Sequence, residues 1–230
     1  TVFQIGTFDR NYAEFAISDN LYLYNEKFPN DVHFRAGIDN PKEDWPFIHP
    51  GPSDAWAGSR SHPFTISFRL NDAPRGEFVL RIGLVRSHGS GAPRFQVDIN
   101  GFSDSIQIPN GTSDAALTDP TQGRPYEMKL VLAPQVFKHG ENKIVLTCTE
   151  GSWILYNAIS LTNNPDISGL KATIDNVSLN PTFRFIKRPN GLKQIVELNA
   201  KSSVGGTDCT IDYQIGSDKQ ETLTVRSGLF

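Results

Sequence analysis

The sequence predicts an all-β protein whose main domain is a β-sandwich or jelly roll, and three observations support this fold class. Apolar and polar residues alternate with a period of two along the whole chain, as in strands that are buried on one face. The composition is rich in turn and strand formers, with 19 Gly, 15 Pro and 15 Phe among 230 residues. No long stretch shows the 3.6-residue period of an amphipathic helix.

Six alternating runs define the predicted strands of the first domain. Each is short and bounded by Gly, Pro, Asn or Asp, which is typical of sandwiches and jelly rolls. The runs lie at residues 64–70, 78–85, 95–99, 126–132, 143–148 and 153–161. Between them, Asn100-Gly101 predicts a tight hairpin turn, and residues 134–138 predict one helical turn that stops at Gly140. The alternation loses its register near Asn157, where we expect a β-bulge.

A change in composition separates a second domain. Residues 163–169, NNPDISG, have the composition of a linker. The strand-like runs after it are more polar and contain no Trp; they lie at 171–179, 183–186, 194–200, 210–215 and 222–225. We therefore expect a jelly-roll domain at 1–162 and a small immunoglobulin-like β domain at 170–230. A domain of this size is marginal as an independent core, so truncation before its last strand is the alternative.

Charge and hydropathy exclude two classes of partner. A formal net charge of −3 offers no extended basic surface to a phosphate backbone, so we expect no nucleic-acid partner. No apolar run approaches the roughly 20 residues of a membrane-spanning helix, so we expect no membrane partner. Cys148 and Cys209 are too few for a disulfide framework. We expect both to be small buried apolar residues, with a bridge between the domains as the alternative.

The motifs of the common enzyme classes are missing from the sequence. It contains no Gly-x-Ser-x-Gly, no phosphate-binding Gly loop, no His-Glu-x-x-His and no dinucleotide fingerprint. A metal or acid–base site could be assembled from His49, His62, Asp44 and Asp54, but their spacing matches no known metal pattern. We expect no catalytic residues and no catalytic metal in this chain, and retain an enzyme in its own right as the minor alternative.

The segment at residues 44–63, DWPFIHPGPSDAWAGSRSHP, contains most of the side chains that could bind a ligand. Its four prolines exclude a regular element and predict a rigid, non-repetitive loop. Trp45 and Trp56 offer apolar faces for stacking on a pyranose ring, and His49, Asp54 and Arg60 offer planar polar groups that orient hydroxyls or a uronate carboxylate. The loop is therefore a candidate carbohydrate-binding surface. The alternative is a plug that closes one end of the sandwich, and one Trp could serve each role.

Two further aromatic candidates, Trp153 and Tyr156, lie at the start of the last strand of the first domain. Alternation places Trp153 and Leu155 on one face of this strand, and Ile154 and Tyr156 on the other. The core is the expected place for Trp153. Contact with a sugar is the alternative, and both aromatic residues are kept as candidates for it.

An ordered series of short motifs resembles the C-terminal module of the rhamnogalacturonan lyases of polysaccharide lyase family 4. The opening residues 2–9, VFQIGTFD, followed by Glu14-Phe15, are similar to the aromatic-x-Ile-Gly-x-Phe-Asp start of that module. The resemblance continues in PFTISF at 63–68, LRIG at 80–83, VDING at 97–101, GENKI at 140–144 and NAISL at 157–161. It covers about residues 1–162. Asn157 stands where the family frequently has Asp, so a charge at this position is not expected.

The resemblance implies a galactose-binding-like β jelly roll with a non-catalytic, carbohydrate-binding role in a polysaccharide-degrading enzyme. The implied partners are a polysaccharide or oligosaccharide and the catalytic domain of the same parent chain. A secreted, periplasmic or cell-surface location follows from that role, as does the interpretation of this chain as a piece of a longer protein. Structural calcium is common in such modules, and it stays open here because the acidic residues are scattered. The rival interpretation is a purely structural accessory region that packs on the catalytic domain.

Overall fold

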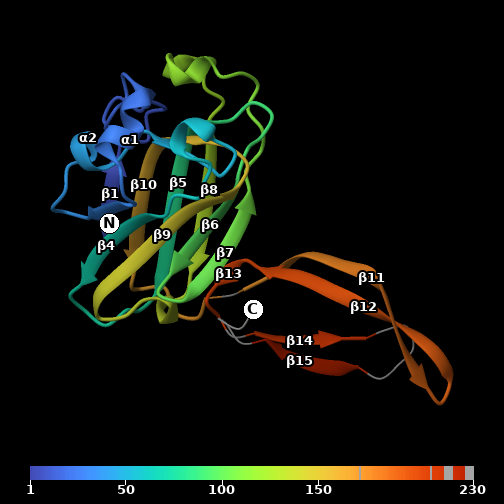
Figure 1. The fold of residues 1–230 in the computed structure, drawn as a ribbon. Coiled ribbons are helices and arrows are strands. Elements are labelled where there is room, and N and C mark those ends of the chain that lie inside the picture. Colours follow the sequence, from blue (N-terminus) through green and yellow to red (C-terminus); the bar gives the residue numbers. More distant parts are fainter. Residues whose placement is uncertain (171, 208, 215–219, 226–230) are drawn as a thin grey trace.

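A computed structural model, which describes residues 1–170, 172–207, 209–214 and 220–225, shows a β-sandwich followed by two β-hairpins (Figure 1). In sheet 1 the strand order is β1-β10-β5-β8-β13, and the short β3 pairs separately with β10. In sheet 2 the order is β2-β4-β9-β6-β7. Sheet 1 contains β1 (Phe3–Gly6), β3 (Ile48–His49), β5 (Glu77–Ser87), β8 (Tyr126–Leu132), β10 (Ile154–Asn164) and β13 (Val204–Gly205). Sheet 2 contains β2 (Val32–Arg35), β4 (Phe64–Leu70), β6 (Arg94–Ile99), β7 (Phe102–Gln107) and β9 (Gly140–Glu150). The predicted sandwich of short strands is confirmed.

Helices are few and short in the described residues, as the sequence predicts. The α-helices α1 (Tyr24–Lys27) and α2 (Pro41–Asp44) have four residues each. The 3₁₀ helices are η1 (Leu21–Leu23), η2 (Ala55–Ala57), η3 (Ala115–Leu117), η4 (Pro120–Gln122) and η5 (Pro134–Val136). The last of these is the predicted helical turn. Within the described ranges, none of the helices has the length and apolar character that crossing a membrane requires.

The core lies between the two sheets, and alternate residues of β6, β8 and β9 are buried in it. From sheet 1, Ile82 and its cross-strand neighbour Ile159 are fully buried, and from sheet 2, Ile66 and its neighbour Ile144 are fully buried. Alternation buries one face of a strand and leaves the other to solvent, whereas β10 is buried on both faces from Ile154 to Leu161. Cys148 also lies in this core as a free, buried thiol, as expected for a small apolar residue. The side chain of Cys209 lies outside the described residues.

Two local predictions are confirmed by the backbone. Asn100 and Gly101 join β6 to β7, and both adopt positive φ angles, 49° and 100°. A two-residue hairpin turn of this type needs positive φ at both positions, which explains the Asn-Gly pair. The pairing of β10 with β5 shifts its register between Leu155 and Tyr156 and again between Tyr156 and Ala158, so the bulge lies next to Asn157.

The region after the sandwich departs from the prediction. Asn163 and Asn164, expected in the linker, are the last residues of β10. The described residues then form two separate two-stranded sheets, β11 (Ile174–Arg188) with β12 (Gly191–Ser202), and β14 (Cys209–Tyr213) with β15 (Glu221–Val225). Between them β13 returns to sheet 1 and pairs in parallel with β8 through Val204 and Gly205. The immunoglobulin-like organisation expected for 170–230 is not confirmed.

The reason is visible in the β11–β12 hairpin, which extends away from the sandwich in Figure 1. One face of this hairpin carries the cross-strand pairs Leu179–Leu198 and Pro181–Val196. In a sandwich this face would be covered by a second sheet, but Leu179 is 65% and Val196 46% exposed. The hairpin is attached to sheet 2 by an ion pair between Lys201 Nζ and Asp104 Oδ2 at 2.9 Å.

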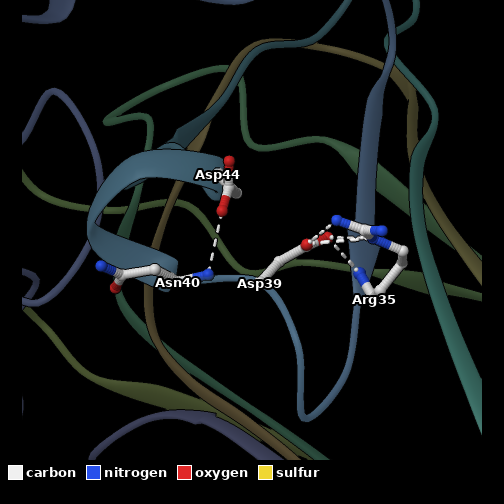
Figure 2. Close-up of polar contacts among 4 residues, drawn as sticks. All are labelled: Arg35, Asp39, Asn40 and Asp44. Atoms are coloured by element: carbon white, nitrogen blue, oxygen red, sulfur yellow. Dashed lines mark hydrogen bonds and ion pairs between the residues drawn. The ribbon is translucent and has the colours of Figure 1, made fainter.

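The loop that was predicted to be rigid begins at α2. Asn40 caps this helix by accepting a hydrogen bond from the backbone N–H of Lys42, and Pro41 occupies the first turn. Figure 2 shows Asp44 reaching back to accept a hydrogen bond of 2.9 Å from the backbone N–H of Asn40. In the preceding turn, hydrogen bonds from Arg35 lower the pKa of Asp39. The loop thus starts from a backbone fixed by its own polar side chains.

After α2 the loop folds inward and closes one end of the sandwich. Trp45 has no exposed surface, and its ring meets those of Phe34, Phe64 and Tyr156 edge-on at centroid distances of 5.8, 5.3 and 5.4 Å. The loop is less irregular than expected, because Ile48 and the next residue form β3 against β10. Prolines flank this short strand but do not interrupt it, so its amides stay free to pair.

His49 connects this loop to both sheets. Its ring stacks on Phe64 of β4 at 3.7 Å, and its Nδ1 lies 2.7 Å from the hydroxyl of Tyr156 on β10. Its Nε2 lies 2.7 Å from the backbone carbonyl of His62. A carbonyl only accepts, so Nε2 carries the proton and Nδ1 accepts from the tyrosine. Complete burial lowers the pKa of His49 to about 3, so this imidazole is neutral in the folded protein.

We predict that acid destabilises the protein through His49. An unfolded histidine titrates near 6.5, whereas the folded one has a pKa of about 3. Between these values only the unfolded state binds the proton, so the free energy of unfolding falls as the pH falls, by up to about 1.4 kcal/mol per pH unit. Urea denaturation of wild type and His49→Gln between pH 7 and 4.5 should show a shallower pH slope in the variant. His33→Gln removes an exposed imidazole and is the control; a wild-type slope in His49→Gln would contradict the prediction.

Trp45 should behave as a core residue. Trp45→Ala is expected to lower the free energy of unfolding by about 3–5 kcal/mol, because the substitution leaves a cavity among three aromatic rings. Tyr22→Ala, at a residue that is 81% exposed, should change it by less than about 0.5 kcal/mol. Equilibrium urea denaturation measures both. A loss below about 1 kcal/mol for Trp45→Ala would mean that the loop does not close the sandwich as described.

Candidate functional site

A pocket of about 350 Å³ opens at the end of the sandwich that the loop closes. It lies among η1, β3, η2, the turn after β5, η3 and the segment before β10, which gather at the end of the sandwich where α1 and α2 lie in Figure 1. Its lining is mostly aromatic and aliphatic, with two polar side chains. The lining residues are Leu21, Tyr22, Ile48, Asp54, Trp56, His88, Leu117 and Trp153.

Three aromatic side chains of the lining differ in exposure. Tyr22 is 81% exposed, Trp56 is half-buried, and Trp153 is buried. Asn20 holds the turn that presents Tyr22, since its side chain accepts a hydrogen bond from the backbone N–H of Tyr22. A ligand in the pocket would therefore meet the faces of Tyr22 and Trp56, with Trp153 further inside.

Two uncharged residues, Tyr24 and Asn25, contact Trp56. The ring of Tyr24 meets it edge-on at 5.8 Å, and Asn25 Nδ2 donates to the carbonyl of Trp56 at 2.6 Å. Tyr24 is in turn paired with His62, whose Nδ1 lies 3.3 Å from the tyrosine hydroxyl and whose Nε2 lies 3.0 Å from the carbonyl of Ala57. Burial raises the pKa of Tyr24 and lowers that of His62, so both are uncharged at neutral pH.

Asp54 is the acidic side chain of the lining. It is only 5% exposed, and its Oδ2 accepts a hydrogen bond of 2.8 Å from the backbone N–H of Gly51. Its Oδ1 accepts from the hydroxyl of Ser152. The two segments approach so closely that a Cβ at Gly51 would lie 2.5 Å from the carbonyl oxygen of Gly151, which explains the glycine. These contacts fix the position of the carboxylate before any ligand arrives.

His88 is the second polar side chain of the lining. Its Nδ1 accepts hydrogen bonds from the backbone N–H groups of Gly91, at 2.9 Å, and Ser90, at 3.3 Å. Nδ1 can accept only when it carries no proton, so in this geometry the imidazole is the neutral form protonated at Nε2. The ring also meets that of Trp153 edge-on at 5.5 Å.

The structure divides the predicted site residues into two groups. Asp54, Trp56 and Trp153 meet at the pocket. Trp45, His49 and Tyr156 do not; they are fully buried in the core, so the sugar contacts expected of them do not fit their burial, and the plug interpretation applies to these three.

Arg60 is not brought to the pocket either. Its Nη1 forms an ion pair of 2.8 Å with Asp31 Oδ1 and also donates to the carbonyl of Ser61. The contact with a uronate carboxylate that was expected of Arg60 is therefore not supported, since the guanidinium is engaged with another carboxylate and lies outside the lining.

Sequence reasoning missed Tyr22 and His88. Tyr22 stands in a polar-flanked LYLY segment where alternation predicts nothing, and only its 81% exposure marks it. His88 follows the end of a predicted strand and precedes Gly89-Ser90-Gly91, a turn signal that could have drawn attention to it.

Metal binding by the loop finds no support in its side chains. Asp44 is committed to the start of α2, and in the described ranges no three His, Cys, Asp or Glu side chains group as metal ligands. Calcium also accepts backbone carbonyls, so this observation concerns only sites built mainly from carboxylates.

Comparisons with known proteins indicate the family of this chain. None of the curated proteins compared matches it significantly. Among solved structures, a family 35 carbohydrate-binding module from an environmental isolate is similar at 17% identity, covering 46% of this chain and 67% of the other, with a TM-score of 0.33. The family 35 module of Abf62 from Cellvibrio japonicus is similar at 17% identity, covering 45% and 65%, with a TM-score of 0.30.

A third similar structure is a much longer enzyme, and the family comparison is the broadest. The family GH115 4-O-methyl-α-glucuronidase BtGH115A, which has specificity for decorated arabinogalactans, matches at 16% identity and a TM-score of 0.29; the match covers 47% of this chain and only 15% of the enzyme. The family model described as CBM-like, polysaccharide lyase family 4, domain III, matches residues 1–161. The chain therefore belongs to the CBM-like domain III family of polysaccharide lyase family 4.

Proposed function

We propose that the sandwich is a non-catalytic, carbohydrate-binding accessory region of a polysaccharide-degrading enzyme, and that it holds a sugar of its glycan in the pocket between Tyr22, Trp56 and Trp153. The observation that carries this proposal is the meeting of accessible aromatic faces with one pre-positioned carboxylate in a pocket of about 350 Å³. Membership in the CBM-like family supports it.

The aromatic faces suit the apolar side of a pyranose ring. Trp56 and Tyr22 have few torsions; the ring of Trp56 already packs against Tyr24, and Asn25 holds its backbone carbonyl. Stacking on a fixed ring costs little side-chain entropy on binding. Affinity would thus come mainly from the removal of apolar surface from water on both partners.

Asp54 would orient the bound sugar through hydrogen bonds. Each carboxylate oxygen accepts one hydrogen bond from the protein, from the Gly51 amide or the Ser152 hydroxyl, and has a further lone pair for a sugar hydroxyl. A charged acceptor forms stronger hydrogen bonds than a neutral one. Asp54 would therefore fix the orientation of a ring that stacks on Trp56.

The outer face of sheet 2 is a poorer candidate for the same role. Its central strands present polar and aliphatic residues there: Thr65, Ser67 and Arg69 on β4, Lys143, Val145 and Thr147 on β9, and Arg94, Gln96 and Asp98 on β6. None of these is aromatic, so this face offers no ring for stacking. The pocket at the end of the sandwich is the better site.

A catalytic role is not included in the proposal. Hydrolysis of a glycosidic bond usually employs a pair of carboxyl groups on either side of the bond, and Asp54 is the single carboxyl group of the lining. The proposal does include a catalytic domain in the same parent chain and a secreted, periplasmic or cell-surface location, because a module of this kind acts where polysaccharides are degraded.

The aromatic faces provide the direct test. Trp56→Ala and Tyr22→Ala should each weaken glycan binding by about 1–3 kcal/mol, a range taken from the stacking of aromatic side chains on nucleic-acid bases. Affinity electrophoresis in gels containing pectic polysaccharides, arabinogalactan or xylan, followed by calorimetry with oligosaccharides of the retained polymer, measures the effect.

Phe8→Ala is the matched control for this test. Phe8 is a half-buried aromatic residue outside the pocket, where the guanidinium of Arg81 lies 4.3 Å from its ring centroid. Its loss should leave binding unchanged. If wild type binds no glycan, the accessory region is purely structural; if it binds and both pocket variants retain full affinity, the glycan lies elsewhere.

A further inference from the structure

We propose that the pocket selects neutral sugars and discriminates against uronic acids. This inference rests on the proposed function, namely that the pocket holds a sugar, and adds to it the chemical class of that sugar. It follows from the charges of the groups that a ligand would meet.

The lining provides a negative charge and no positive one. Asp54 is the charged member of the lining, and six of the other residues are aromatic or aliphatic. The remaining one, His88, can accept from Gly91 and Ser90 only in its neutral form. A ligand carboxylate in this pocket would therefore face a carboxylate and uncharged walls.

Two arginines that lie close to lining residues in the sequence, Arg60 and Arg86, bind other groups. Arg60, on the same loop as Asp54, is paired with Asp31 and lies outside the lining. Arg86, two residues before His88, is 1% exposed, and its two terminal nitrogens donate to the carbonyl of Gln122 and the hydroxyl of Thr112. Neither side chain forms part of the surface that a sugar would touch.

These charges predict which sugars the pocket favours. A uronic acid differs from the corresponding hexose by a carboxylate in place of the hydroxymethyl group at C5. Moving that carboxylate from water into an aromatic pocket is unfavourable without a cation or several donors, and the like charge of Asp54 adds to the cost. The neutral hydroxymethyl group meets neither penalty and can donate a hydrogen bond to Asp54.

The test compares neutral and acidic ligands that differ in the group at C5. The probes are galacto-oligosaccharides, oligogalacturonides and fully methyl-esterified oligogalacturonides of equal length, together with the matched gluco and glucurono pair on a glycan array. Calorimetry at pH 7 and about 20 mM salt should show each neutral ligand that binds to be at least about tenfold tighter than its acidic counterpart. The difference should persist in 0.5 M salt, because a buried carboxylate such as Asp54 is screened far less than an exposed one.

Asp54→Asn provides a second test and Glu26→Gln its control. The amide keeps the shape of Asp54 and an oxygen for the Gly51 amide, so the variant should narrow the difference between neutral and acidic ligands by several-fold. Glu26 is an exposed carboxylate outside the lining, and its variant should keep the full difference. If Asp54→Asn does not fold, the comparison of free with methyl-esterified oligogalacturonides on wild type carries the test.

The outcomes separate the two proposals. Equal or tighter binding of the acidic ligands, lost in Trp56→Ala, overturns the neutral-sugar inference and leaves the proposed function standing. An absence of binding by every ligand overturns the proposed function and this inference with it. Binding that survives Trp56→Ala and Tyr22→Ala places the glycan outside the pocket, which also overturns the inference.

Discussion

The contact on which the closed end of the sandwich depends is the hydrogen-bonded imidazole of His49. Its two nitrogens join the hydroxyl of Tyr156 on β10 to the carbonyl of His62 at the end of the loop, and its ring lies flat on Phe64 of β4. The sheets and the loop are thus tied at one buried point. A charged ring is disfavoured there, because complete burial lowers the pKa of His49.

Much of the sandwich follows from the period-two pattern alone. The runs at 64–70 and 126–132 coincide with β4 and β8, because each strand buries one face and exposes the other. Local chemistry also predicted the Asn100-Gly101 turn and the bulge beside Asn157. The region after residue 164 could not be predicted in the same way. Alternation in β11 and β12 predicts strands with one apolar face, but it does not say whether another sheet covers that face, and here Leu179 stays largely exposed.

The sequence predicts which types of residue form the site, but not which individual residues lie at it. Trp45 and Trp56 lie eleven residues apart in one loop, and no local pattern distinguishes them. Trp45 is nevertheless fully buried, whereas Trp56 is half-buried. The difference arises from partners distant in the sequence, Phe34 and Tyr156 for Trp45, and Tyr24 for Trp56. The ion pair of Arg60 could not be predicted either, because no pattern in its own segment indicates Asp31 as its partner. Tyr22 and His88 joined the site through proximity in space that no local pattern encodes.

The bond between Asp54 and Ser152 has a consequence for how binding competence arises during folding. Its partners are 98 residues apart in the chain, and the strands β4, β5, β6, β7, β8 and β9 all lie between them in the sequence. Contacts of such long sequence separation form slowly, since the entropy of loop closure is lost before they are made. The pocket should be among the last features of the domain to assemble. A peptide copied from the loop would carry both tryptophans and still lack the recognition surface.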